Sequence, residues 1–558
     1  MGELSPRVLC GLVLLALAGC GAAPGPAAAP APEPQQVPPN VRLRLLVERY
    51  WDEHLAADNA ISPQWLADSL NIERRYLAEV LNVPRDGLDA AARLTYDIFR
   101  RQREHSIEGF TFPGELLPID PFGGTPQQFA ARAVGLARHA PSSVADYENW
   151  LKHIDEYVRW TQQATLNMRE GIRRGYTSPR VLIDRMLPIL ERLGADESAN
   201  VFYAPLRSMP ETIREPERGQ LSKAMSSAVA EKLLPANRAL HDFLQREYLP
   251  RARVGIALSE LPLGKQWYAY RVKKATGAAL SPDEINRVGV AEVERLGAPQ
   301  QPRDAAPLAG IELVSAYREL ESRVRPALAG LFSEIPNVDF DIRAADWLPA
   351  PESALYYQRA AAIGSEPAVL YVNTARTAPA VSMASFLEQG WPGHHLQLAL
   401  QERADLPRFR RFGAEAAFTE GWGLYAVSLG EALSLYPDEA AKLDAAAAEM
   451  QCAVALVVDT GLHAKGWSRA RALDYLHAHL GIEDLGAQAV IDSYAAHPAD
   501  ALACMIGGLK FRALRARAQQ ALGARFDIRE FHAEILRDGA MPMDILEAKM
   551  KAWTDASK

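Results

Sequence analysis

Apolar residues recur at helical spacing along nearly the whole chain beyond residue 40. Leu43, Leu46, Val47 and Tyr50 fall on one face of a helix with 3.6 residues per turn. Similar amphipathic stretches cover residues 145–175, 180–195, 224–250, 280–297, 310–333, 440–480 and 508–536. The pattern therefore predicts a mainly α-helical protein.

Boundary signals sharpen this prediction. The segment Ser281-Pro-Asp-Glu284 combines a helix-capping serine, a proline in the first turn and acids beside the helix dipole, so a helix is expected to begin there. Strand candidates are few: residues 369–373 read as the best one and residues 338–342 as the next. We expect a large helical fold with a small β element.

A segment bearing Gly and Pro, Leu261-Pro-Leu-Gly-Lys265, separates two helical regions. We read it as a seam between an N-terminal helical subdomain, residues 41–260, and a second subdomain, residues 261–558.

The first forty residues have the organisation of a lipoprotein leader. Residues 8–18 form an apolar run of signal-peptide length, too short to cross a bilayer as an ordinary anchor. The run ends in Leu17-Ala-Gly-Cys20, and small residues before a cysteine are typical of lipoprotein signal cleavage. Residues 1–20 are thus expected to be the signal peptide, with acylated Cys20 as the membrane anchor. The alternative is a signal peptide without lipidation, since Arg7 is the only cation ahead of the run.

Residues 21–40 consist almost wholly of Ala, Pro, Gly and Gln, which favours an extended tether over a helix. The expected protein is a lipoprotein facing the periplasm, and by analogy its anchor lies in the outer membrane.

The net charge and the cysteine content limit the possible binding partners and disulfides. The 558 residues carry a formal net charge of -8 and no basic block, so nucleic acid is not expected as a partner. Beyond the leader only Cys452 and Cys504 remain. They could pair in an oxidising compartment, but a chain of this size needs no disulfide for stability, so we expect two buried free thiols.

The candidate chemistry lies between residues 371 and 507. A block containing Gly-Trp-Pro-Gly-His-His395 is followed by Thr419-Glu-Gly-Trp422. Imidazole and carboxylate are good zinc ligands, and a catalytic zinc needs about three of them plus an open position. His394, His395 and Glu420 could supply them. Alternatively, the histidine pair caps a helix by bonding backbone groups.

These blocks resemble the bacterial domain-of-unknown-function family 885. Two further blocks, Asp459-Thr-Gly-Leu-His463 and one beginning at His497-Pro498, follow in the family's order, and the similarity covers most of the mature chain. Its members resemble zincin metallopeptidases and are often lipoproteins. The resemblance implies a largely helical, zincin-like fold in which a His-Glu helix and a later Glu-bearing helix hold a metal.

The family pattern carries over residue by residue. Pro392, Gly393, His394 and His395 match, and Glu420 matches the later ligand. Asp459 and His463 match as well. Glu388, however, stands where the family has its first ligand histidine, and Gln389 stands where it has the catalytic glutamate.

The last blocks also depart from the family. Ala455 replaces an arginine, Ala499 a glycine, Asp500 a glutamine and Cys504 a tyrosine. The tyrosine would be a natural donor to an oxyanion, whereas a thiol is a weak one. Asp500 and Glu388 remain candidates for a replacement base.

These departures leave two functions open. A glutamate beside the metal takes a proton from the attacking water, and Gln389 has no basic oxygen with which to do so. One interpretation is a metallohydrolase for peptide or amide substrates, with zinc held by His394 or His395, Glu420 and Glu388. The other is a pseudoenzyme of the same fold that binds peptides or supports another envelope component. Because Glu388 and His394 are six residues apart, either needs a break in the helix near Pro392.

Overall fold

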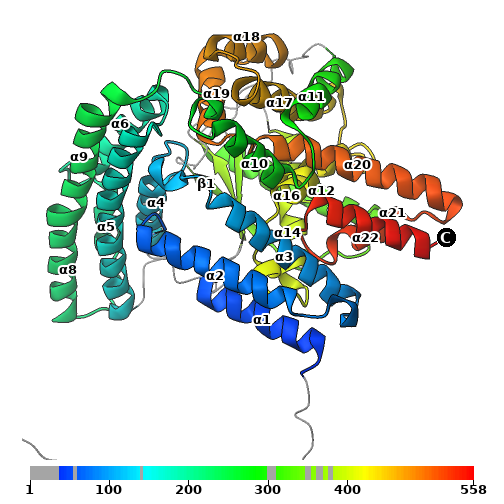
Figure 1. Ribbon diagram of the computed structural model, residues 1–558, viewed down its shortest axis with the longest axis horizontal. Coiled ribbons are helices and arrows are strands. Elements are labelled where there is room, and N and C mark those ends of the chain that lie inside the picture. Colours follow the sequence, from blue (N-terminus) through cyan, green and yellow to red (C-terminus); the bar gives the residue numbers. More distant parts are fainter. Residues whose placement is uncertain are drawn as a thin grey trace, which may run out of the picture. The chain divides into compact units, whose positions relative to one another are not determined.

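Helices make up most of the protein in the computed structural model (Figure 1). The structure describes residues 37–54, 60–138, 143–297, 310–345, 354–359, 368–374 and 381–558. The predicted signal peptide, Cys20 and nearly all of the tether fall outside these ranges. Residues Pro39–Lys558 form one compact unit. Most of its elements are helices, so the prediction of a mainly helical fold is confirmed.

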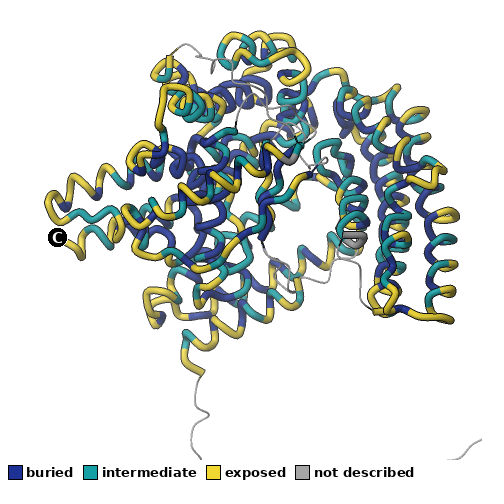
Figure 2. The backbone as a smooth tube through the Cα atoms, turned by 180° about the vertical axis from the view of Figure 1, so that it is seen from behind, coloured by how far each residue is buried: buried dark blue, intermediate teal, exposed yellow. Residues whose placement is uncertain are grey.

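A bundle of antiparallel helices occupies the region between residues 119 and 252. It consists of α4 (Thr125–Arg138), α5 (Val144–Arg174), α6 (Arg180–Gly194), α7 (Ala204–Arg207), α8 (Glu217–Ala228) and α9 (Leu234–Phe243). Phe129 stacks between Trp150 and Tyr157 in its core, with ring centroids 4.8 and 4.4 Å away. The buried stripe along each helix faces this core (Figure 2), as the 3.6-residue period requires.

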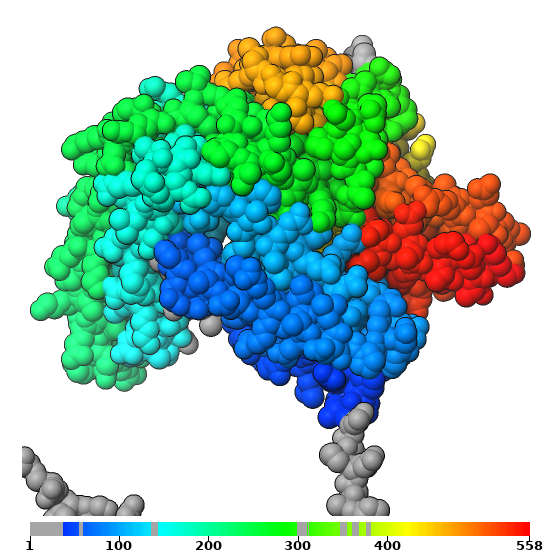
Figure 3. All heavy atoms as spheres, viewed as in Figure 1, coloured from blue at the N-terminus to red at the C-terminus, as the bar shows by residue number. Residues whose placement is uncertain are grey.

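The first three helices pack with the C-terminal half of the chain. They are α1 (Pro39–His54), α2 (Pro63–Leu81) and α3 (Ala90–Gly109). Their aromatic core of Tyr50, Tyr76 and Phe99 is continuous with Phe409, whose ring lies 5.1 Å from that of Phe99. On the face shown in Figure 3, α3 meets the last helix, α22 (Met543–Ala556). Segments from both ends of the chain therefore lie side by side.

The candidate blocks fall on helices within this body. Before them come α10 (Gly264–Thr276), α11 (Pro282–Leu296) and α12 (Gly310–Ala327). The blocks themselves lie on or beside α13 (Met383–Gln389), α14 (His394–Arg403), α16 (Ala416–Ser428), α17 (Glu439–His463) and α20 (Leu502–Leu522). Between them come α15 (Arg408–Arg411), α18 (Arg469–Leu480) and α19 (Asp484–Ala496), and α21 (Ile528–Leu536) follows. Ser281 caps α11 in a capping box with Glu284, so the predicted start of this helix is confirmed.

Two long predicted helices are broken in the structure. The stretch 440–480 divides after His463, where Gly466 adopts a φ of 68°. The stretch 508–536 divides at Gly523, with a φ of 54°. Positive φ ends a helix, and glycine adopts it without the steric cost of a Cβ atom.

A three-stranded sheet in the order β1-β3-β2 packs beside α12 and α13. β1 (Phe340–Ala345) runs parallel to β3 (Ala368–Asn373). β3 matches the strand predicted at 369–373, and β1 overlaps the one predicted at 338–342 but ends three residues later. β2 (Leu355–Gln358) pairs antiparallel to β3 as an edge strand. Its four residues were not predicted, because so short a run carries no readable alternation.

Among the described residues, one helix, α17, is long and apolar enough to cross a membrane by length and composition alone. Of its most apolar window, 61% is buried inside the structure, so packing in the protein core accounts for its hydropathy.

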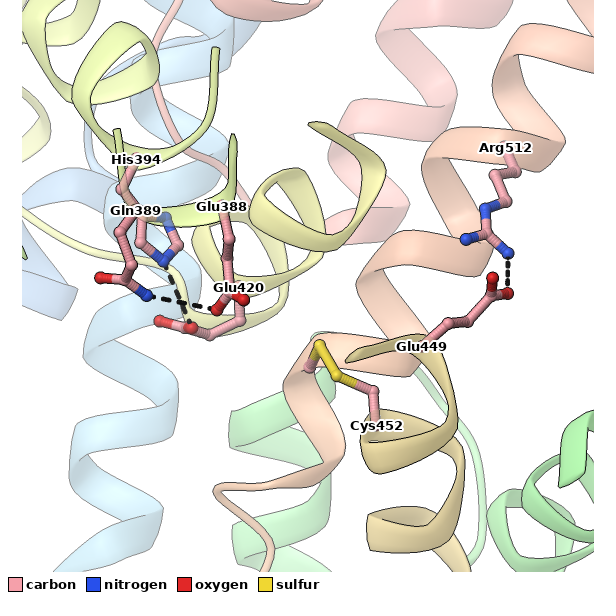
Figure 4. The surroundings of a disulfide bond; sticks show 8 residues. Glu388, Gln389, His394, Glu420, Glu449, Cys452 and Arg512 are labelled. Atoms are coloured by element: carbon pink, nitrogen blue, oxygen red, sulfur yellow. Dashed lines mark hydrogen bonds and ion pairs between the residues drawn. A yellow bond between two sulfur atoms is a disulfide. The ribbon is translucent and has the colours of Figure 1, made fainter. Parts of the chain in front are cut away.

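The expectation of two free thiols is wrong. Cys452 on α17 and Cys504 on α20 form a disulfide, with Cα atoms 5.9 Å apart (Figure 4). Packing of α17 on α20 brings together two cysteines that are 52 residues apart in sequence. Cys504 therefore has no S–H group to donate to an oxyanion.

Candidate functional site

The candidate site begins at the turn between α13 and α14. α13 ends at Gln389 and α14 begins at His394, so the break required by the spacing of Glu388 and His394 is present. A Cβ atom on Gly393 would lie 1.8 Å from the carbonyl oxygen of Glu388, which leaves room there only for glycine. The Trp422 indole Nε1 donates to the carbonyl of Pro392 at 2.9 Å and ties the turn to α16.

Glu388, His394 and Glu420 converge from three helices (Figure 4). One potential ligand atom from each lies within 4.8 Å of the other two, and His394 Nε2 is 3.6 Å from a carboxylate oxygen of Glu420. Gly423, one turn after Glu420, makes this approach possible. A Cβ atom there would come within 2.9 Å of Glu388 Cγ and 3.0 Å of His394 Cε1.

The three groups perturb one another electrostatically. Burial raises the pKa of Glu388 above its ordinary value, and this effect outweighs the opposing charge of His394. Burial would lower the pKa of His394, but the carboxylates of Glu420 and Glu388 outweigh it and raise that pKa. The charge of His394 likewise outweighs partial burial at Glu420, whose pKa is lowered. The Glu420 side chain is 47% exposed, so one side of the cluster is open to solvent.

The donor set fits a divalent metal ion. Two carboxylates and one imidazole suit zinc or a harder ion of the first transition row. Among the described residues the buried Nδ1 of His394 has no hydrogen-bond partner, whereas a histidine with a purely structural role normally engages both ring nitrogens. These three residues could hold a metal ion and leave coordination positions free on the solvent side.

His395 does not join this cluster. Its Nε2 donates to the carbonyl of Val338 at 2.9 Å, and its Nδ1 accepts from the Tyr357 hydroxyl at 2.9 Å. Consecutive residues on a helix point about 100° apart, so His394 and His395 face different neighbours. His395 is fully buried, and both of its ring nitrogens are engaged.

Gln389 lies beside the cluster without entering it. Its Nε2 donates to Glu388 Oε1 at 3.2 Å (Figure 4). Its Oε1 accepts from the backbone N–H of Tyr357 at 3.3 Å. The side chain therefore bridges the edge strand β2 and the potential ligand Glu388.

Asp459 and His463 form a second polar cluster on α17. The Tyr268 hydroxyl and the Ala499 N–H donate to Asp459 at 2.5 and 3.0 Å. Nδ1 of His463 accepts from the N–H of Leu258, and Nε2 donates to the carbonyl of Tyr494. Both side chains are fully buried, and each bonds residues far apart in the sequence. This bonding joins segments of the fold around α17.

Asp500 and Cys504 lie apart from the Glu388 cluster. Asp500 is 61% exposed and forms an ion pair with Arg271 at 3.0 Å. Cys504 is held in the disulfide. Neither contacts Glu388, His394 or Glu420 among the interactions of the described residues.

Two contributors were missed by sequence reasoning. Gly423 could have been found, because Glu420 and Gly423 are three residues apart and share a helix face. The contact of Tyr357 with Gln389 left no sequence signal, because it depends on a strand too short to predict.

The chain belongs to the bacterial protein family of unknown function DUF885, whose model matches residues 50–550. Its fold is similar to that of the "putative lipoprotein" from Colwellia psychrerythraea, with a TM-score of 0.81, 22% identity and coverage of 93% of this chain and 100% of that one. It is also similar to a "putative lipoprotein of unknown function" from Shewanella oneidensis, with a TM-score of 0.63, 13% identity and coverage of 91% and 99%. No curated protein matches the sequence.

Proposed function

We propose that this protein is an envelope lipoprotein, anchored through Cys20, that uses a divalent-metal site to bind peptide or amide substrates. Glu388, His394 and Glu420 are the proposed ligands, and zinc is the first candidate metal. The observation that carries the proposal is the convergence of Glu388, His394 and Glu420, with one potential ligand atom from each residue within 4.8 Å of the other two. The zincin-like character implied by the family pattern agrees with this ligand set but is itself part of the proposal.

A bound metal would polarise the carbonyl of an amide substrate as a Lewis acid. Whether hydrolysis then occurs depends on a proton acceptor supplied by the chain itself. Gln389 holds an amide where the family has its glutamate, so no carboxylate at that position can take a proton from water. Losing a general base costs roughly 10²–10⁴-fold in rate. We therefore propose substrate binding with little or no hydrolysis.

The second candidate is an active hydrolase in which Glu388 accepts the proton. The raised pKa of this buried carboxyl group favours it, because a base works best when its pKa lies near the working pH. This role would compete with metal ligation by the same carboxylate.

Metal content and peptide turnover decide between these functions. The chain without its leader should carry about one divalent ion by elemental analysis, and Glu420→Ala should lose it. A mixed peptide library incubated with the protein should remain uncut. Gln389→Glu should show whether a base at this position creates activity. Brisk cleavage by the wild type that disappears in Glu420→Ala would replace the binding function with the hydrolase, and absence of metal from the wild type would remove both.

A further inference from the structure

Gln389 has two specific bonds that a degenerate remnant of a catalytic residue would not need. Its amide connects the backbone of β2 to the carboxylate of Glu388, with one bond in each direction. It sits at the last position of α13, directly after Glu388. The Gln389 side chain therefore links the backbone of Tyr357 to the carboxylate of Glu388 beside the cluster.

The surroundings allow only one orientation of the amide. The backbone N–H of Tyr357 can only donate, so the atom facing it must be the oxygen Oε1. The –NH₂ group then faces Glu388, whose ionised carboxylate can only accept. Tyr357 is itself fixed, because its hydroxyl donates to the buried His395.

We infer that Gln389 is a positioning residue: it anchors the carboxylate of Glu388 to the edge strand β2 and aims its free oxygen at the shared centre with His394 and Glu420. This inference rests on the proposed metal site. Outer groups that orient a ligand typically contribute ten- to a hundredfold to metal affinity.

The same geometry makes residue 389 depend on residue 388. A glutamate at position 389 could accept from Tyr357, but its second oxygen would face the Glu388 carboxylate at hydrogen-bond distance. Two carboxylates at that distance repel each other. A neutral histidine at position 388 would remove one of these two charges, so a glutamate at 389 would not face a second carboxylate. Glu388 and Gln389 are thus a matched pair: a glutamate at position 388 favours an uncharged amide at position 389.

Metal affinity tests the positioning role. Titration of the leaderless protein with zinc chloride should give an affinity ten- to a hundredfold lower for Gln389→Met, which keeps the length of the side chain but removes both bonds. The matched control is Gln358→Met, the same change at an exposed position on β2, which should bind zinc like the wild type. A purely structural role would lower the unfolding midpoint of Gln389→Met and leave its zinc affinity unchanged, and that outcome would overturn the inference.

A four-protein cycle tests the pairing without any metal. In chelator-treated protein at neutral pH, Gln389→Glu should lower the thermal unfolding midpoint by several degrees. In the Glu388→His background the same change should lower it by less than one degree. Equal shifts in the two backgrounds would overturn the matched pair. If the wild type bound no zinc while this coupling remained, the proposed function would fail and the link between the two residues would stand.

Discussion

Two clusters of carboxylate and imidazole side chains in the described residues differ in how many of their buried polar atoms have hydrogen-bond partners. In the Asp459–His463 cluster each side chain is fully buried, and both ring nitrogens of His463 are engaged. In the Glu388–His394–Glu420 cluster the buried Nδ1 of His394 has no hydrogen-bond partner in the described part of the chain, and the Glu420 side chain is half exposed. The two clusters contain the same kinds of chemical group. What distinguishes them is whether each buried polar atom has a hydrogen-bond partner. A saturated cluster holds the fold together, and an unsaturated one is available to a ligand.

The disulfide connects the helices that support the two clusters. It joins α17, which carries Asp459 and His463, to α20, which packs against α16, the helix that carries Glu420. Glu449 and Arg512 form an ion pair between the same two helices (Figure 4). Any coupling between the clusters therefore has a direct structural route through α20.

Removing the disulfide should have the largest effect on stability. For a separation of 52 residues, loop-closure entropy predicts a loss of about 4 kcal/mol in the free energy of unfolding. Denaturant unfolding of Cys452→Ser/Cys504→Ser against the oxidised wild type measures it. A reducing agent should destabilise the wild type and leave this variant unchanged. Zinc affinity should change less than tenfold, because the ligands are held by α13, α14 and α16, and a larger change would show that the clusters are coupled.

Paired alanine substitutions test the comparison directly. Asp459→Ala leaves the Tyr268 hydroxyl and the Ala499 N–H buried without an acceptor, which should cost about 3 kcal/mol. Glu420→Ala should cost less than about 1 kcal/mol in metal-free protein, because this side chain is half exposed.

Zinc affinity should show the reverse order for the same two variants. It should fall more than about a hundredfold in Glu420→Ala, since loss of a ligand exceeds loss of an outer-shell partner. It should be unchanged in Asp459→Ala. Similar stability losses in the two variants would contradict the division between a structural and a ligand-binding cluster.

Acid should destabilise the protein through its saturated histidines. Burial lowers the pKa of His395 and His532 to about 4 and that of His463 to about 3. Their folded pKa values lie below the unfolded value near 6.5, so their contribution is complete above pH 6.5 and is lost as the pH falls toward 4. Burial raises the pKa of Asp459 to about 7, which works in the opposite direction. From these four groups together, the loss between pH 7 and 5.5 is about 2 kcal/mol.

Urea unfolding at a series of pH values measures this dependence. His532→Gln should reduce the slope of stability against pH by about one proton, because one of the three groups is then missing. His532 is a suitable choice, since its Nδ1 donates to the carbonyl of Leu331 and its Nε2 accepts from the Tyr425 hydroxyl, and neither partner is a proposed ligand. A stability that stays constant from pH 7 to 5.5 would contradict the neutral, saturated state of these histidines.

The sequence was informative wherever the determinant is local. Helical periodicity, the cap at Ser281 and the apolar runs of β1 and β3 are all properties of neighbouring residues. The need for a break before His394 came from counting residues per turn. The sequence could not assign the roles of His394 and His395, because these depend on which element packs against each face of α14. It could not show the disulfide either, since that pair exists only through the contact of α17 with α20.

The smallest expected effect concerns the backbone that completes the saturated cluster. Ala499 adopts a φ of 75°, in the left-handed region, at the position where the family pattern has glycine. A Cβ atom is strained there, so Ala499→Gly should relieve strain, partly offset by the greater freedom of glycine in the unfolded chain. The expected gain is about 0.5–1 kcal/mol in the free energy of unfolding. The N–H that bonds Asp459 remains, so zinc affinity and the pH dependence should not change.

Ala447→Gly, at an exposed helical position of α17, is the control and should cost about 1 kcal/mol. If both variants were destabilised alike, Ala499 would be unstrained, and the Asp459 cluster would owe its geometry to side chains alone.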